Sequence, residues 1–273
     1  MKFKLISYQC FLLLTSLILN ACSSNQPVSD NQPKRLALFF ANGAYESPEY
    51  VRLENPINDA RKVAASLKKA GFTSFIFQDL PSKGAMEQAF KAFLELVDDN
   101  DIVLFYFAGH GVQESGKSYL IPTNAMTPAK EYLDQNAFPA QYVMERLYKK
   151  GNRKEKGINI FVLDTCRNPY KNPSELKDDL VGVGGGNTMV IFSTKSGEEA
   201  AEGEKGKNSP FARFLVEGIN QWHWRPLEDV LQAVGKDVRE KTPSEQQVYV
   251  YGWVGKPFCL SQCLGTQNIT ITP

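Results

Sequence analysis

Two side chains that could do covalent chemistry each follow an apolar run. His110 stands shortly after Ile102–Phe107, and Cys166 stands shortly after Ile158–Leu163. Each run predicts a buried strand that delivers its reactive residue to the carboxyl end of the strand. Imidazole can take up a proton near neutral pH, and a thiol becomes a strong nucleophile once it is deprotonated. The pair therefore predicts a cysteine hydrolase, and of the two histidines only His110 follows a strand-like run.

The segments that must position this pair alternate between strand and helix. Strands are predicted over Lys34–Ala41, Phe72–Phe77, Ile102–Phe107, Ile158–Leu163, Met189–Ser193 and Val248–Tyr251. Helices are predicted over Asn58–Ala70, Ala85–Val97, Ala140–Lys149, Pro210–Asn220 and Pro226–Glu240. This alternation predicts an α/β domain with a mostly parallel sheet and helices on both faces. Ligands bind at the carboxyl ends of the strands in such sheets, and both reactive residues are expected there.

The two motifs resemble those of a known family. Phe107–Gln113 (F-A-G-H-G-V-Q) and Leu163–Asn168 (L-D-T-C-R-N) are similar to the catalytic motifs of caspase-like peptidases, with the bacterial caspase-domain and metacaspase branch most similar. The histidine and the cysteine are 56 positions apart, close to the roughly 50 residues typical of caspases. The Q-A-C-x-G pattern of animal caspases is absent. The resemblance extends over about Arg35 to Val254 and implies a caspase-like sandwich.

The resemblance also implies catalytic roles. Cys166 would be the nucleophile, His110 the general base and acid, and the backbone amides of Gly111 and Cys166 would bind the oxyanion. No third residue that orients the imidazole can be chosen from the sequence. A binding or scaffold protein with this fold and no turnover stays open, because a fold does not determine a function.

The position of Asp164 indicates which substrate residue precedes the cut bond. In an extended chain it points to the same side as Cys166, where a carboxylate would raise the pKa of the thiol rather than activate it. It is better interpreted as the floor of a pocket for a cationic substrate side chain, which predicts cleavage after Arg or Lys, with Arg favoured. The resemblance implies the same and adds Asp59 as a second wall. A helix cap is an equally good interpretation of Asp59.

A nucleotide hydrolase is a more remote alternative. Gly111–Ser118 (G-V-Q-E-S-G-K-S) satisfies the P-loop pattern and follows a predicted strand. A P-loop must open into a helix whose amino end holds the phosphate. Here Tyr119–Pro122 follows instead, which is typical of a strand stopped by proline.

The amino terminus has the layout of a secretory signal. Lys2 and Lys4 precede the apolar stretch Leu5–Leu19. The next residues, Leu19–Ser24 (L-N-A-C-S-S), resemble the lipobox of bacterial lipoproteins. That resemblance implies cleavage before Cys22 and attachment of lipid to it, so the membrane is an expected partner. An ordinary signal peptide with an incidental cysteine is the alternative.

The chain is therefore expected to contain three parts. These are a signal peptide over residues 1–21, a polar tether over 22–33 and one peptidase domain over 34–273. The lipoprotein resemblance implies a location at the cell envelope. Because Ser23 rather than Asp follows Cys22, it implies the outer membrane facing the periplasm in a Gram-negative host.

The net charge and the remaining cysteines indicate which partners and which covalent bonds to expect. The formal net charge of +1 creates no strong field, so no nucleic-acid partner is expected. Cys259 and Cys263 predict a local disulfide in an oxidising compartment, with two unpaired thiols as the alternative. No cofactor or metal is expected. The acidic pairs Asp178–Asp179 and Glu198–Glu199 could attract calcium, but a solvated surface is the simpler interpretation.

Overall fold

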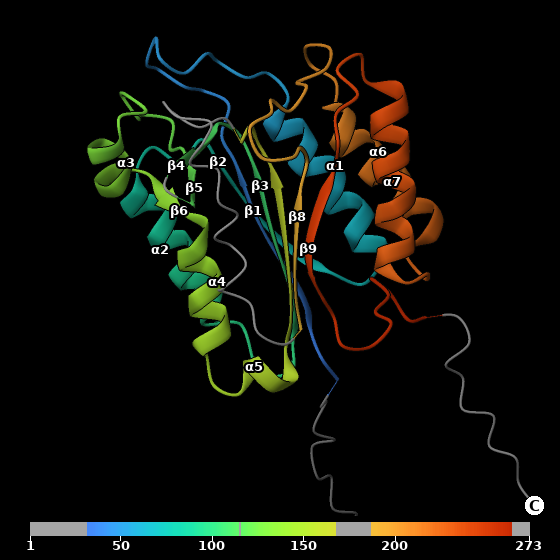
Figure 1. The fold of residues 1–273 in the computed structure, drawn as a ribbon. Coiled ribbons are helices and arrows are strands. Elements are labelled where there is room, and N and C mark those ends of the chain that lie inside the picture. The colour runs from blue at the N-terminus through green and yellow to red at the C-terminus, as the bar shows by residue number, and fades with distance from the viewer. Residues whose placement is uncertain (1–31, 115, 168–186, 264–273) are drawn as a thin grey trace, which may run out of the picture. The chain divides into compact units, whose positions relative to one another are not determined.

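A six-stranded sheet forms the centre of the fold, in the order β2-β1-β3-β7-β8-β9 (Figure 1). The computed structural model describes residues 32–114, 116–167 and 187–263. The chain divides into residues 1–32 and 33–273, and the fold is that of the second unit. The strands are β1 (Arg35–Ala41), β2 (Thr73–Gln78), β3 (Ile102–Ala108), β7 (Ile158–Asp164), β8 (Thr188–Phe192) and β9 (Tyr249–Trp253). All pair in parallel except β9, which runs antiparallel to β8.

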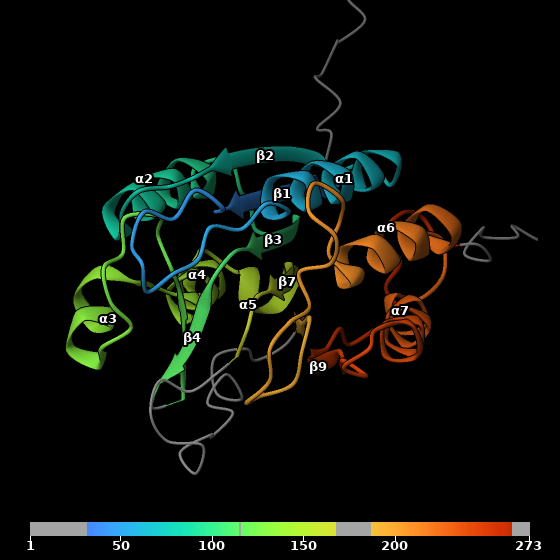
Figure 2. The ribbon, with the colours of Figure 1, turned by 90° about the horizontal axis from the view of Figure 1, so that it is seen from above.

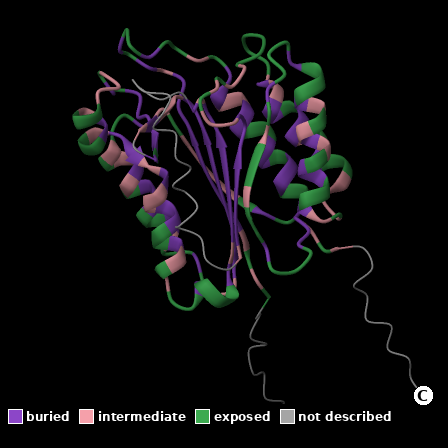
Figure 3. Ribbon diagram, viewed as in Figure 1, coloured by how far each residue is buried: buried purple, intermediate pink, exposed green. Residues whose placement is uncertain are grey.

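Helices cover both faces of this sheet (Figure 2). On one face lie α1 (Pro56–Lys69), α6 (Pro210–Trp222) and α7 (Leu227–Lys241), and on the other lie α2 (Lys83–Leu94) and α4 (Ala140–Lys149). Alternate side chains of each strand feed two separate cores, so that Phe39 packs toward α1 and Phe40 toward α2. The central strands are buried on both sides (Figure 3), which explains their near-continuous apolar sequences. The predicted α/β fold with a mostly parallel sheet is confirmed.

A small second sheet extends from the carboxyl end of β3. In it β4 (Gly111–Glu114) pairs antiparallel with β5 (Lys117–Leu120), which also pairs with β6 (Phe138–Pro139). The segment that satisfies the P-loop pattern is therefore a hairpin, and no helix opens from it to hold a phosphate.

Some elements were not predicted from the sequence. These are β6 and the short helices α3 (Lys130–Asn136) and α5 (Arg153–Lys156). They span two, seven and four residues, too few for a periodic pattern to appear. The predicted strands and the longer helices are present, with ends shifted by a few residues.

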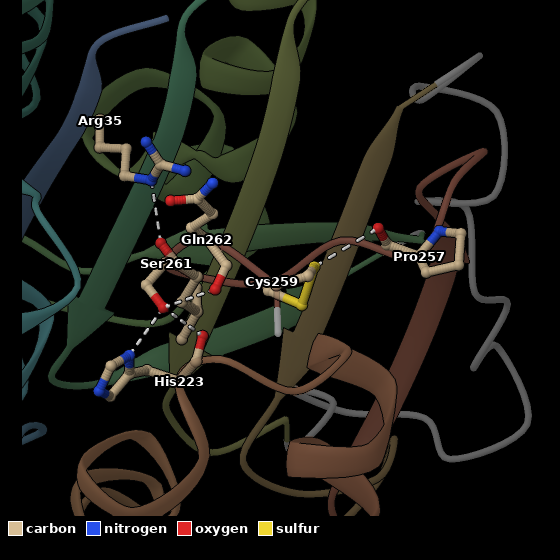
Figure 4. Close-up of a disulfide and its surroundings, with 8 residues drawn as sticks. Arg35, His223, Pro257, Cys259, Ser261 and Gln262 are labelled. Carbon is tan, nitrogen blue, oxygen red and sulfur yellow. Dashed lines mark hydrogen bonds between the residues drawn. A yellow bond between two sulfur atoms is a disulfide. The ribbon is translucent and has the colours of Figure 1, made fainter. Parts of the chain in front are cut away.

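The amino-terminal end of the sheet is closed by the last described segment of the chain. Cys259 and Cys263 form a disulfide there (Figure 4). Next to it the Leu260 carbonyl accepts a hydrogen bond from Nε of Arg35, at the start of β1. Ser261 bonds to His223, the C-cap residue of α6, through its hydroxyl and its backbone amide. This segment, residues 254–263, is called the carboxyl strap below.

Candidate active site

The register of the sheet brings the reactive histidine and cysteine to one place. On the neighbouring strands β3 and β7, Ala108 pairs with Asp164. His110 and Cys166 each lie two residues beyond that pair and both line a cavity of about 70 Å³. Cys166 is not in a disulfide. The structure places both residues just beyond the carboxyl ends of two strands, as predicted, and shows in addition that these strands are neighbours.

The two glycines that flank His110 are required by close contacts. A Cβ atom on Gly109 would lie 2.7 Å from the hydroxyl oxygen of Tyr45, and its φ of +151° is one that L-residues rarely adopt. A Cβ atom on Gly111 would lie 2.2 Å from Oγ1 of Thr165. The absence of side chains at the two glycines of the G-H-G motif therefore allows the backbone at Gly109 to lie against Tyr45 and the backbone at Gly111 to lie against Thr165.

The imidazole of His110 is held by a partner that the sequence did not reveal. Its Nε2 lies 2.7 Å from the backbone carbonyl oxygen of Val51, in the segment between β1 and α1. The ring lies against Tyr45 and Tyr50, with centroid distances of 4.5 and 5.4 Å. Because a carbonyl only accepts, Nε2 must carry the proton, and Nδ1 of the neutral ring is left to act as base.

Gly111 lies beside the cysteine, as an oxyanion role requires. A Cβ on it would also lie 3.1 Å from the Cys166 carbonyl oxygen. The direction of the Gly111 and Cys166 amides toward a substrate carbonyl stays a prediction.

Two buried carboxylates form one wall of the same cavity. Asp164, at the end of β7, is 7% exposed, and Asp59, in the first turn of α1, is 2% exposed. Asp164 Oδ2 accepts hydrogen bonds from the Tyr106 hydroxyl (3.1 Å) and the Ser209 hydroxyl (2.9 Å). Asp59 Oδ1 accepts from Nδ2 of Asn208 (2.7 Å) and from the backbone N–H of Ser209 (3.0 Å).

The helix-cap interpretation of Asp59 does not describe this geometry. The residue before α1 is Asn55, and the backbone N–H of Asp59 donates to the Asn55 carbonyl as an ordinary helical bond. The Asp59 carboxylate bonds instead to residues 208 and 209, which precede α6. Asp59 thus joins the cavity wall together with Asp164.

Comparison with known proteins agrees with this arrangement. Residues 34–257 match the caspase domain, a family of peptidases. The chain belongs to the caspase family. The solved structure of caspase-1 from Spodoptera frugiperda shares its fold, with a TM-score of 0.63 over 88% of this chain and 97% of that one, at 15% sequence identity.

Two curated proteins are more similar to this chain in sequence. The human mucosa-associated lymphoid tissue lymphoma translocation protein 1 is 29% identical over 201 residues, or 72% of this chain and 23% of that protein. The paracaspase of Dictyostelium discoideum is 23% identical over 211 residues, or 72% of this chain and 47% of that protein. This caspase-family chain thus matches about a quarter and about half of their lengths. The resemblance to caspase-like peptidases is confirmed.

The carboxylates of this caspase-family site are pushed toward their protonated forms. Burial, together with the charge of Asp164, raises the pKa of Asp59 from 3.8 to about 7. Burial also raises the pKa of Asp164, although the hydrogen bonds from Ser209 and Tyr106 oppose the shift. Because two interacting buried carboxylates disfavour a second negative charge, a cation beside them would favour the ionised forms of both.

The pKa values of His110 and Cys166 are both shifted toward the uncharged forms of these side chains. Burial lowers the pKa of His110, against the opposing effect of the hydrogen bond to Val51. Burial raises the pKa of the Cys166 thiol, and the carboxylates of Glu199 and Asp164 add to that shift. Both shifts favour the uncharged forms of the Cys166 thiol and the His110 imidazole.

Glu202 is a residue of this site that sequence reasoning missed. It lines the cavity, and its charge acts on His110. Its Oε1 accepts a hydrogen bond from the backbone N–H of Glu54, and its backbone carbonyl accepts one from Nδ2 of Asn55, just before α1. Glu202 lies in a loop without a periodic sequence pattern, so its place in the site could not be predicted from the sequence.

The remaining predicted residues lie elsewhere. Cys259 and Cys263 form their disulfide in the carboxyl strap, near the opposite ends of the strands. Cys22 and Asp178–Asp179 fall outside the described residues. Within the described ranges, no three His, Cys, Asp or Glu side chains group as a metal site would need. No helix among them is both long and apolar enough to cross a membrane.

Proposed function

We propose that this protein is a cysteine endopeptidase that uses a His110–Cys166 dyad and cleaves after Arg, with Lys as a weaker alternative. One observation carries the proposal. A single cavity contains the dyad together with the buried carboxylates of Asp59 and Asp164. Membership of a peptidase family supports the reaction class, and the acidic wall supports a cationic substrate side chain.

The proposed chemistry follows from the tautomer of His110. Nδ1 takes the thiol proton as Sγ of Cys166 attacks the scissile carbonyl carbon. The backbone amides of Gly111 and Cys166 would stabilise the oxygen that becomes negative. His110 then returns the proton to the leaving amine, so that a thioester remains on Cys166. Water activated by the same nitrogen hydrolyses this thioester and restores the thiol.

The pocket would favour Arg because of geometry as well as charge. A guanidinium is planar and presents paired N–H donors, which suit two carboxylates facing one cavity. The ammonium of Lys is a more compact charge and makes fewer directed bonds. An Asp side chain before the cut would face like charge in a largely dry pocket, so cleavage after Asp is not expected.

A matched peptide pair tests the specificity. Fluorogenic peptides that differ only in Arg or citrulline before the reporter share shape but not charge. The full chain should cleave the Arg peptide about 10- to 1,000-fold faster, the range expected for a desolvated charge-assisted contact. Equal cleavage of both peptides, or a preference for Asp, would refute the pocket. Cys166→Ala should abolish all cleavage, whereas full activity in that variant would refute the dyad.

We also propose that the protein is lipid-anchored at Cys22 in the cell envelope. The support for the anchor comes from the sequence: an apolar stretch that ends in L-N-A-C-S-S, followed by a polar segment with two prolines before the domain. An extracytoplasmic location also suits the Cys259–Cys263 disulfide, because such bonds persist in oxidising compartments.

A further inference from the structure

Ser209 contacts both carboxylates of the cavity. Its backbone N–H donates to Oδ1 of Asp59 at 3.0 Å, and its hydroxyl donates to Oδ2 of Asp164 at 2.9 Å. The residue is itself buried, with 5% of its surface exposed. One residue thus connects a carboxylate on α1 to a carboxylate on β7.

The hydroxyl of Ser209 also caps α6, and this second hydrogen bond determines where the hydroxyl proton points. Ser209 is the N-cap of α6, and its Oγ accepts a hydrogen bond from the backbone N–H of Ala212 at 3.0 Å. A hydroxyl has one proton to donate and two lone pairs that accept. Because the helix N–H occupies a lone pair, the proton is left to point at Asp164. Pro210 at the first helical position restricts the backbone there.

Other donors complete the support around each carboxylate. Tyr106, fully buried in β3, donates to the same Oδ2 of Asp164, and Asn208 donates to the same Oδ1 of Asp59. None of these bonds from Tyr106, Asn208 and Ser209 uses the second oxygen of either carboxylate. These three donors therefore each occupy one oxygen of a carboxylate and fix the orientation of that carboxylate.

We propose that Ser209 is a positioning residue of the cationic pocket, which holds the two carboxylates at the separation that accepts one guanidinium. This inference rests on the proposed function. Ser209 acts through Asp59 and Asp164 rather than by touching the reacting atoms. Its hydroxyl also favours the charged form of Asp164, because a donor to a carboxylate opposes protonation. Without that donor, Asp164 should take up a proton at higher pH and lose its attraction for Arg.

The chain offers a matched control for the loss of a helix cap. Ser82 caps α2 as Ser209 caps α6, with its Oγ accepting the backbone N–H of Ala85 at 3.2 Å. Ser82 does not line the dyad cavity. Ser82→Ala should therefore lower thermal stability through the lost cap without changing the kinetics.

The experiment compares Ser209→Ala, Ser209→Thr and Ser82→Ala in the full chain. We expect Ser209→Ala to raise KM for the Arg peptide about 10-fold with little change in kcat, since a hydrogen bond to a charged group is lost. Cleavage of the citrulline peptide should change less than about 2-fold in the same variant, because a neutral side chain does not need the charged pair. Ser209→Thr keeps the hydroxyl and should restore KM. The pH at which Arg cleavage reaches half its maximum should move upward only in Ser209→Ala.

A readout without substrate separates this inference from the proposed function. Carboxyl titration by NMR should show a higher apparent pKa for the Asp59–Asp164 pair in Ser209→Ala and an unchanged one in Ser82→Ala. An unchanged titration in Ser209→Ala, or equal losses for Arg and citrulline peptides, would overturn the positioning role. If neither peptide is cleaved by the wild-type chain, the proposed function fails, and the titration alone decides the inference.

Discussion

Burial favours the uncharged forms of His110 and Cys166, and this has a measurable consequence. The raised pKa of Cys166 means that the thiolate is scarce at neutral pH and increases as the pH rises toward the alkaline range. Alkylation of Cys166 by iodoacetamide, followed by peptide mass mapping, should therefore be slow at neutral pH and accelerate with alkalinity. His110→Ala should leave the neutral rate nearly unchanged.

The opposite pattern would contradict a neutral pair. A fast, pH-independent alkylation that collapses in His110→Ala would show a preformed thiolate–imidazolium pair. Peptides containing Cys259 or Cys263 serve as an internal control, because their sulfurs are joined and should not react without reductant.

Ionisation of Asp59 should lower the free energy of unfolding of the protein above neutral pH. The pKa is about 7 in the folded state against an ordinary 3.8, so the folded chain retains a proton that the unfolded chain releases between these values. Its stabilising contribution is complete below pH 3.8 and is lost as the pH rises through about 7. Asp59→Asn should therefore raise Tm in mildly alkaline buffer by about 2–8 °C, the shift for ~1–2 kcal/mol in a domain of this size.

The same variant should lose function while it gains stability. Cleavage after Arg should fall by about 10-fold or more, because half of the acidic pair is gone. Thermal melts of wild type and Asp59→Asn across pH would provide the check, and their Tm values should converge in acid. A lower Tm for the variant at every pH would contradict the assignment.

At the scale of elements, α6 connects the two ends of the domain. Its N-cap, Ser209, lies beside the cavity, and its C-cap, His223, bonds to Ser261 in the carboxyl strap. The disulfide closes a short ring in that strap, and it should contribute about 2 kcal/mol, from the loop-closure entropy of about five residues. Loss of the disulfide should therefore destabilise the fold without changing the chemistry at the other end.

The double variant Cys259→Ser/Cys263→Ser tests this separation. Its Tm should fall by about 4–8 °C, the shift for ~2 kcal/mol in a domain of this size. Cleavage of the Arg peptide at low temperature should be unchanged. Reductant should lower the Tm of wild type and have no effect on the double variant. A loss of activity that exceeds the loss of folded protein would mean that the strap influences the site.

Local signals made much of this arrangement predictable. Apolar runs mark the central strands, and the residue after each run is at its carboxyl end, so the places of His110 and Cys166 followed. Contacts between segments that are far apart in the sequence leave no local sequence pattern and could not be predicted. Val51 contributes a backbone carbonyl to His110, which any residue could supply. Arg153 is fully buried among carbonyls of residues 98, 101 and 158, although arginine usually lies at the surface.

At the scale of the whole molecule, the proposed anchor is the feature to test. If lipid on Cys22 holds the protein, Cys22→Ala should move it from the membrane fraction to the soluble fraction or leave the precursor uncleaved. Labelling with a fatty-acid analogue should mark wild type and spare the variant. Unchanged membrane retention with no lipid label in wild type would refute the anchor, and peptidase activity toward the Arg peptide would still test the dyad.

The contact between the Val51 carbonyl and His110 determines what a mutational screen of position 51 should find. The side chain of Val51 is 66% exposed, and only its backbone oxygen holds the imidazole. Substitutions there alter a solvated side chain and leave the carbonyl in place, so a saturation screen should score position 51 as tolerant. An amide-to-ester replacement of the following peptide bond would weaken that acceptor. The contribution of this carbonyl to the orientation of His110 would thus be invisible to mutational tolerance and open only to chemical synthesis.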